Sequence, residues 1–178
     1  MDYRKSQTGN AMGDSRRFDL FGALVAGNLE PGMHIADIAA GKGYLRANLY
    51  QRGFHNVTSW DKRRGCARGR PGYRYGYFDH RSAPSYDAVV AMHPDGGTDE
   101  AIVYAGERRV PAIVCPCCVV PSAATYWGSH GSYEEWMRHL SALALKLRLS
   151  VTDVNLPMVG RNRVLILRPS PTVSGSEP

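Results

Sequence analysis

Two kinds of hydrophobic pattern follow one another along the chain: short runs that are mostly apolar, and longer stretches with apolar residues at helical spacing. Short runs bounded by glycine, proline or polar residues are typical of strands, and a run that is apolar throughout is typical of a strand buried on both faces. The sequence predicts strands of this kind at residues 35–39, 57–60, 73–78, 86–92, 111–120, 150–156 and 163–168.

The stretches between the runs carry helix signals. Apolar residues from Phe18 to Leu29 lie on one face of a predicted helix, which Asp14 or Ser15 can cap. Residues 44–52 predict a second helix, which ends at Gly53. We expect both helices to pack on the sheet.

Two further helices are marked by their first turns. Thr98 can cap a helix whose next residues, Asp99 and Glu100, suit the positive end of a helix. Ser132 and Glu135 have the spacing of a capping box. The helix after them carries an apolar face at Trp136, Leu140, Leu143 and Leu147.

Strands that alternate with helices predict a parallel sheet with helices on both faces, and two successive strands at the end predict an antiparallel edge. We therefore expect an α/β fold in three layers, with a doubly wound, mostly parallel seven-stranded sheet and an antiparallel C-terminal edge strand. Residues 14–168 form a single domain in this interpretation, between a flexible arm at 1–13 and a disordered tail at 169–178.

Composition narrows the choice of partners only slightly. The 22 Lys and Arg residues exceed the 16 Asp and Glu residues, which gives a formal charge of +6 and a weak preference for polyanions. The chain has four cysteines, no apolar signal-like start and no apolar run of the ~20 residues that a membrane span needs. We expect a cytoplasmic protein with no membrane partner.

The stretch from Ile35 to Leu45 joins an apolar strand, a small turn and the start of a helix. Its acid, Asp37, precedes the turn, whereas a dinucleotide-binding turn has its acid about 20 residues later. Small residues in a turn let the backbone approach a ligand closely. Those of this turn are Ala39, Ala40, Gly41 and Gly43.

This stretch resembles motif I of the class I S-adenosylmethionine (SAM) methyltransferases, Asp/Glu-x-Gly-x-Gly-x-Gly, with Ala39 in place of the first glycine. The order of the predicted elements is similar to the Rossmann-like architecture of that family from about Arg16 to Arg168. The resemblance implies SAM as cofactor, methyl transfer as activity, and a hydrogen bond from the methionyl amine to Asp37. The alternative is an ordinary strand-to-helix turn of another α/β protein.

Asp61 directly follows the second predicted strand. In the methyltransferases an acid at this place binds both ribose hydroxyls of the cofactor, which a carboxylate can do because it accepts several donors at once. The resemblance implies that role for Asp61. The alternative is a surface acid that pairs with Lys62.

Two further residues at strand ends are predicted to contact the cofactor. Asp79, after the third predicted strand, matches an acid that contacts the adenine amino group in the family, although His80 and Arg81 compete for its carboxylate. Met92 ends the fourth predicted strand and lies at the same edge of the sheet.

His93-Pro94-Asp95-Gly96 follows that strand, where methyltransferases keep substrate-facing residues. It is not the Asn/Asp-Pro-Pro-Tyr tetrad of the nucleic-acid amino methyltransferases, so we do not expect methylation of a base amine by that route. With Thr98-Asp99 it is similar to the His-x-Cys-Gly…Thr-Asp stretch of RNA ribose methyltransferases and their relatives, with Asp95 in place of the cysteine. Those proteins also carry paired cysteines after the fifth strand, as Cys117-Cys118 does here.

His93 and Asp95 are the candidate catalytic residues. Each can accept a proton near neutral pH, so one of them can deprotonate the methyl acceptor or orient it. In the alternative interpretation, His93 ends the strand and Asp95 forms an Asx-turn.

The sequence Cys115-Pro116-Cys117-Cys118 invites comparison with a zinc site, because thiolates bind zinc. A strand would direct Cys115 and Cys117 to one face and Cys118 to the other, and no CxxC or HxxxH partner follows. We therefore expect buried apolar cysteines and no metal.

Residues predicted to bind the methyl acceptor come from two segments. The first is the basic stretch from Lys62 to Arg74, where cations that include Arg63 and Arg64 alternate with tyrosines, as in sites for single-stranded nucleic acid. A solvated basic loop is the alternative. The second is a loop that holds Tyr126, Trp127 and His130, which can form a wall of the site or simply pack.

The sequence therefore predicts a SAM-dependent methyltransferase with RNA slightly favoured as acceptor. A small-molecule O- or N-methyltransferase is the first alternative, suggested by the compact chain. A non-catalytic SAM-binding or scaffold protein is the second, because motif I lacks its first glycine at Ala39.

Overall fold

The computed structural model describes residues 14–67, 69–118 and 132–171. Its strands are β1 (Ile35–Ile38), β2 (Val57–Asp61), β3 (Tyr73–Tyr75), β4 (Ala88–Met92), β5 (Ala112–Cys115), β6 (Leu149–Asn155) and β7 (Arg163–Pro169). Its helices are α1 (Arg17–Ala26), α2 (Tyr44–Gln51), α3 (Arg64–Ala67), α4 (Thr98–Arg108) and α5 (Tyr133–Lys146), and a 3-10 turn, η2 (Asp95–Gly97), precedes α4.

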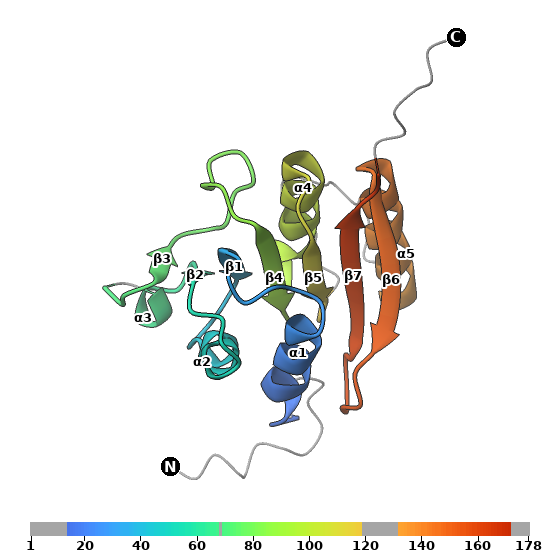
Figure 1. Cartoon of the computed structure of the whole chain (residues 1–178). Helices are drawn as coiled ribbons and strands as arrows, with labels where there is room; N and C mark the ends of the chain where they lie inside the picture. The colour runs from blue at the N-terminus through green and yellow to red at the C-terminus, as the bar shows by residue number, and fades with distance from the viewer. Residues whose placement is uncertain (1–13, 68, 119–131, 172–178) are drawn as a thin grey trace.

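The strands form one seven-stranded sheet in the order β3-β2-β1-β4-β5-β7-β6 (Figure 1). Neighbouring strands from β3 to β5 pair in parallel, and β7 pairs antiparallel with both β5 and β6. The predicted α/β fold with a mostly parallel sheet is confirmed. The antiparallel strand β7 lies one place inside the sheet, because β6 forms the edge.

Helices cover both faces of the sheet, α1 and α2 on one and α4 and α5 on the other (Figure 1). Successive strand residues point to opposite faces, so Val89 and Val90 of β4 are both fully buried but belong to different apolar clusters. The cluster under α1 and α2 includes Phe21, Val25, Leu45 and Leu49. The cluster under α4 and α5 includes Ile102, Tyr104, Trp136 and Leu140.

Several predicted strands are shorter in the structure. β4 begins at Ala88 because the backbone N–H of Tyr86 donates to the Tyr104 hydroxyl, 2.8 Å away, and not to a neighbouring strand. β5 ends at Cys115, before Pro116, which has no N–H to donate. β3 ends at Tyr75, before Gly76 at φ 141°.

Helix starts were predicted with mixed success. The capping box of Ser132 and Glu135 is confirmed. The prediction for Thr98 was wrong: Gly97 is the N-cap, and Thr98 is the first helical residue, its buried hydroxyl without a hydrogen-bond partner among the described residues. Asp14 and Ser15 do not cap α1, whose N-cap is Arg16. The short helix α3, inside the predicted basic loop, was missed.

None of the helices in the described part of the chain is both long and apolar enough to span a membrane. β7 runs to Pro169, the first residue of the predicted tail. The predicted arm at 1–13 and residues 172–178 lie outside the described residues.

Candidate active site

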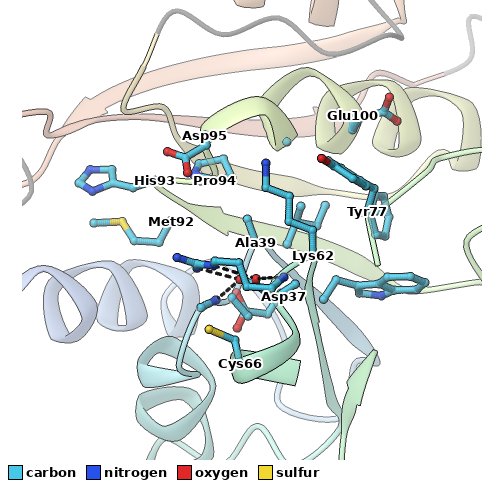
Figure 2. A pocket seen from close by; sticks show the side chains of 18 of the residues that line it. Asp37, Ala39, Lys62, Cys66, Tyr77, Met92, His93, Pro94, Asp95 and Glu100 are labelled. Atoms are coloured by element: carbon cyan, nitrogen blue, oxygen red, sulfur yellow. Dashed lines mark hydrogen bonds and ion pairs between the residues drawn. The ribbon is translucent and has the colours of Figure 1, made fainter. Parts of the chain in front are cut away.

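A pocket of about 850 Å³ opens beyond the carboxyl ends of β1, β2 and β4 (Figure 2). This is the edge at which open parallel sheets bind ligands. The predicted site residues that line it are Asp37, Ala39, Ala40, Gly41, Asp61, Arg63, Asp79, Met92, His93 and Asp95. The fold therefore brings residues from distant parts of the chain to one cavity.

The turn after β1 repeats a left-handed backbone at every second residue. Ala39 has φ 55°, Gly41 φ 58° and Gly43 φ 82°. A Cβ on Gly43 would lie 1.5 Å from the Tyr73 hydroxyl oxygen, so a side chain there would have to displace the Tyr73 ring. Gly43 does not line the pocket, and its role is to start α2. Ala39 has the same backbone without the freedom of glycine, which makes it the strained residue of the turn.

Asp37 lies near the end of β1 and is 1 % exposed. Its carboxylate accepts a hydrogen bond from the Ser59 hydroxyl at 3.2 Å. Burial raises the pKa of Asp37 to about 7, and the bond from Ser59 opposes this rise only in part. The carboxyl group is therefore close to half ionised at neutral pH, and a cationic ligand group would favour its charged form.

Asp61 ends β2, is 3 % exposed, and accepts four hydrogen bonds. Two come from backbone N–H groups, that of Gly41 at 2.7 Å and that of Arg63 at 2.8 Å. The other two come from the Arg63 guanidinium at 2.9 Å, one to each carboxylate oxygen. The four acceptor positions of the carboxylate are thus filled, two of them by one movable side chain.

These contacts fix the charge of Asp61. Burial acts to raise the pKa of Asp61, but the hydrogen bonds from Arg63 and Gly41 outweigh it and hold the pKa below its usual range. The partner is not Lys62, whose ammonium lies 5.0 Å from the centre of the Tyr77 ring, so that alternative was wrong. The Arg63 side chain is 60 % exposed and is free to leave at little desolvation cost.

Asp79 also lines the pocket, but its carboxylate is already bonded within its own turn. It accepts from the Arg81 backbone N–H at 3.0 Å and from the Ser82 hydroxyl at 2.9 Å. His80 bonds more closely to Glu100, at 2.8 Å against 4.0 Å to Asp79.

His93 and Asp95 both have left-handed backbones, at φ 53° and 50°. Such strain in residues other than glycine is typical of functional sites. The Nε2 atom of His93 lies 2.8 Å from the Arg161 carbonyl oxygen, which can only accept, so Nε2 carries the proton. Nδ1 is buried and has no hydrogen-bond partner among the described residues. Burial lowers the pKa of His93, which keeps the ring neutral near pH 7.

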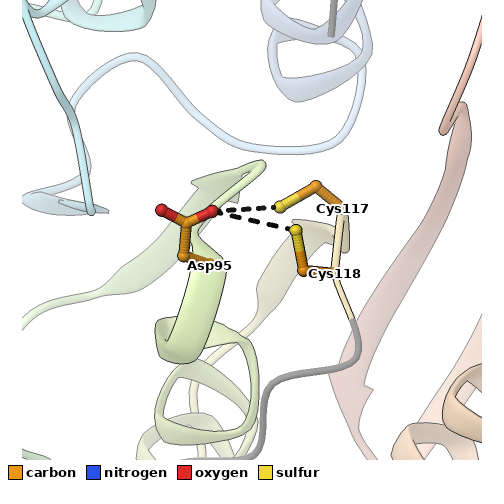
Figure 3. Close-up of side chains that lie close together, drawn as sticks. All are labelled: Asp95, Cys117 and Cys118. Atoms are coloured by element: carbon orange, nitrogen blue, oxygen red, sulfur yellow. Dashed lines mark hydrogen bonds between the residues drawn. The ribbon is translucent and has the colours of Figure 1, made fainter. Parts of the chain in front are cut away.

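The cysteines are not arranged as predicted. β5 ends at Cys115, so strand alternation does not apply to the next residues, and the thiols of Cys117 and Cys118 both point to Asp95 (Figure 3). Their sulfur atoms lie 3.4 Å and 4.0 Å from Asp95 Oδ1. Cys115 and Cys117 are buried as expected, whereas Cys118 is exposed. The Asp95 carboxylate therefore accepts from thiols, not from an Asx-turn.

Cations and rings pair on the surface beside the pocket. The Arg64 guanidinium lies 5.8 Å from the centre of the Tyr75 ring, and Lys62 lies over Tyr77. The rings of Tyr75 and Tyr77 are half or more exposed. Lys62 and Tyr77 also line the pocket, whereas Arg64 does not. The predicted Tyr126, Trp127 and His130 lie outside the described residues, as does Arg68.

The sequence did not reveal every residue of the pocket. Arg17 and Phe18 of α1 line it, although Phe18 was assigned only to the packing face of that helix. The Arg17 guanidinium lies 4.6 Å from the centre of the Phe18 ring. Trp60 and Phe78, whose rings meet edge to face at 5.5 Å, form an apolar wall. The available signal was that these two aromatic residues directly precede Asp61 and Asp79.

No protein-family model and no curated protein matches the chain. Solved structures do match in three dimensions. DesVI of Streptomyces venezuelae is 11% identical, with a TM-score of 0.58 over 88% of this chain and 93% of that one. A SAM-dependent methyltransferase from Aquifex aeolicus is 12% identical, with a TM-score of 0.54 over 87% and 92%.

A putative RNA methyltransferase from Pyrococcus horikoshii is 18% identical, with a TM-score of 0.53 over 95% of this chain and 88% of that one. At such low identity these likenesses concern the fold alone. Together with the strand order, they show that the chain has the fold of the class I SAM-dependent methyltransferases.

Proposed function

We propose that the chain is a SAM-dependent methyltransferase. The observation that carries this proposal is the meeting of Asp37, the turn at Gly41 and Asp61 in one pocket of about 850 Å³. The class I fold supports it, because the pocket lies at the edge of the sheet where open α/β folds bind ligands.

The residues present fit SAM. The buried Asp37 carboxyl would accept the methionyl ammonium, and the backbone at Ala40 and Gly41 would lie along the ligand without side chains in the way. Asp61 would accept both ribose hydroxyls in the two places that the Arg63 guanidinium now fills. Asp79, Met92 and the wall of Trp60 and Phe78 would surround the remaining parts. When bound, SAM supplies an electrophilic methyl group on its sulfonium.

The protein would then contribute mainly position and proton transfer. His93 and Asp95 lie at the same edge, after β4, and line the same pocket. The neutral His93 ring, held through Nε2 by the Arg161 carbonyl, presents Nδ1 as its basic atom. The exposed Asp95 carboxylate is the more accessible of the two proton acceptors.

RNA is the acceptor that we favour. The pairs Lys62 with Tyr77 and Arg64 with Tyr75 place cations beside exposed rings next to the pocket, which suits the phosphates and bases of a single strand. One similar structure is named a putative RNA methyltransferase. The alternative is a small acceptor, because part of the mitomycin 7-O-methyltransferase MmcR, 56% of its chain, matches this fold with a TM-score of 0.54.

Transfer of labelled methyl from SAM to fractionated RNA, protein and metabolite pools tests the activity. We expect label in the RNA pool, and much less label with an Asp61→Asn variant at a SAM concentration that does not saturate it. Label in the metabolite pool would replace RNA by a small acceptor. Binding of SAM without label in any pool would favour a non-catalytic SAM-binding protein.

RNA binding is tested separately by its dependence on salt. Neutralising Lys62 and Arg64 to glutamine should weaken binding and reduce the salt slope by about one for each phosphate that the variant no longer neutralises. The matched control is the same change at Arg138 and Lys146, two exposed cations of α5 that do not line the pocket. Equal effects of the two double variants would contradict a specific RNA surface.

A further inference from the structure

Asp95, Cys117 and Cys118 place three potential metal ligands around one point (Figure 3). One oxygen and two sulfur atoms all lie within 4.8 Å of one another. We propose that these residues form a binding site for one zinc ion. The proposal does not depend on the methyltransferase activity, because it concerns the ligand atoms alone. With zinc bound, Asp95 is a metal ligand, and His93 is then the proton acceptor of the proposed methyl transfer.

The separations of these atoms fit a tetrahedral ion. Zinc binds thiolate sulfur at about 2.3 Å and carboxylate oxygen at about 2.0 Å, which places oxygen and sulfur ligands roughly 3.5 Å apart at a tetrahedral angle. The Oδ1 atom of Asp95 lies 3.4 Å from the sulfur of Cys117 and 4.0 Å from that of Cys118. A zinc ion therefore fits between them with side-chain shifts of a few tenths of an ångström.

The backbone fixes this arrangement from two neighbouring strands. β4 and β5 pair in parallel, so the segments that follow them leave the sheet side by side. Asp95 begins η2 with φ 50°, a costly conformation for a residue with a side chain, and its carboxylate faces the cysteines. Pro116 ends β5 and frees Cys117 and Cys118 from strand alternation, so that both thiols face the same oxygen.

The other candidate cluster of metal ligands is already satisfied by hydrogen bonds. Asp79, His80 and Glu100 also lie close together, but Glu100 already accepts from His80 at 2.8 Å and Asp79 accepts from Ser82 at 2.9 Å. Those hydrogen bonds satisfy the groups without an ion. Thiols are weak donors, so the Asp95 cluster gains far less from the contacts that it makes without an ion.

The ligand set also indicates what kind of zinc site this is. Three protein ligands leave one coordination position for water or another small ligand, which is typical of catalytic and not of closed structural sites. Because Asp95 lines the pocket and Cys118 is exposed, that position is open to molecules that enter the pocket.

Titration of the full chain with Co²⁺ tests the site. The protein is first freed of metal, reduced with a phosphine and kept without oxygen. We expect one equivalent of cobalt to give the thiolate charge-transfer band and the visible bands of a tetrahedral ion, and one equivalent of Zn²⁺ to abolish both. Cys117→Ser and Cys118→Ser should each lose a large part of the charge-transfer band, and Asp95→Asn should weaken the binding of both metals.

Cys66→Ser is the matched control, because Cys66 is a partly exposed thiol outside the cluster and should leave the spectrum unchanged. Cys118 is exposed, so its variant should keep the fold, and circular dichroism verifies this for each variant. Absence of a thiolate band, or an undiminished band in the folded Cys118→Ser variant, would overturn the proposal.

Discussion

The two halves of the pocket are built in different ways. At the ends of β1 and β2, a buried acid, a turn of small residues and a second acid follow one another within 25 residues of sequence, from Asp37 to Asp61. At the ends of β4 and β5, Asp95 meets cysteines that lie 22 and 23 residues away, across two strands. The separations along the sequence are similar, so the two halves differ in their sequence signals: glycines mark the turn of the first half, whereas the left-handed residues of the second, His93 and Asp95, are not glycines.

The difference also concerns where backbone strain lies. In the first half the left-handed positions at Gly41 and Gly43 carry no side chain, and only Ala39 is strained. In the second half the left-handed residues are His93 and Asp95, whose side chains face the pocket or the cysteines. The first half thus leaves space for a ligand next to the backbone, whereas in the second half the strained backbone directs the side chains of His93 and Asp95.

Among the changes in the first half, replacing Asp61 should weaken SAM binding most. A hydrogen bond to a charged acceptor is worth about 1.5–3 kcal/mol, so Asp61→Asn should weaken SAM binding by roughly 10- to 100-fold. His93→Gln, in the second half, should leave SAM affinity unchanged. Asp153→Asn is the control for loss of an acid paired with arginine, since Asp153 pairs with Arg163 on β6 and β7, outside the pocket. Calorimetry measures the SAM affinity of the three variants, and equal affinities would contradict the assignment of Asp61 to the SAM site.

The pH dependence of SAM affinity tests Asp37. Because the pKa of Asp37 is about 7 and the charged carboxylate attracts the ammonium, SAM affinity should rise with pH up to about 7 and then level off. Below pH 7 the rise approaches about tenfold per pH unit. Asp37→Asn should bind weakly at every pH. A parallel pH profile in the variant would assign the titration to another group.

The same pKa predicts the opposite trend for stability without ligand. A carboxyl group whose pKa is raised on folding stabilises the protein most below its unfolded value of 3.8, and this contribution is lost as the pH rises through about 7. Asp37→Asn should therefore flatten the decline in the free energy of unfolding between pH 4 and 7. Urea denaturation measures it, and an unchanged slope would contradict the buried state of Asp37.

Restoring the first glycine tests the strain at Ala39. The left-handed backbone costs a residue with a side chain about 1 kcal/mol, so Ala39→Gly should raise the free energy of unfolding by about that amount. Ala47→Gly, in the exposed part of α2, is the matched control and should lower it by about 1 kcal/mol. Destabilisation by both changes would mean that Ala39 is not strained.

Removing Arg63 should have the smallest effect, and in the opposite direction. Its guanidinium fills the two positions on Asp61 that ribose would need, and because the Arg63 side chain is 60 % exposed, releasing it to solvent costs about 0–1 kcal/mol. Arg63→Met should therefore tighten SAM binding by up to about fivefold. Arg64→Met, the neighbouring control, should not. Weaker binding by Arg63→Met would show that Arg63 contacts the ligand.

The sequence predicted the first half of the site well because a turn of small residues and the ends of two apolar strands mark it. Strand ends and the glycine spacing placed Asp37, Gly41 and Asp61, and the structure puts all three at one pocket. The pairing of Asp61 with Arg63 was not predicted, although these residues lie two positions apart, and α3, which begins at the next residue, has only four residues and no periodic signal.

The second half could not be predicted in the same way. The strand pattern assigned Cys117 and Cys118 to opposite faces, since nothing in an apolar run shows that β5 ends as early as Cys115. His93 and Asp95 have left-handed backbones, but neither residue is a glycine or an asparagine, so the sequence did not indicate this conformation. Contacts across strands, such as that of His93 with Arg161, follow only from the sheet order.

The central claim is that the pocket binds SAM, and calorimetric titration of the folded chain with SAM and with S-adenosylhomocysteine tests it most directly. We predict saturable binding of one equivalent of each ligand, which Asp61→Asn weakens strongly. Absence of a binding signal from the folded wild-type chain with either ligand would contradict the account.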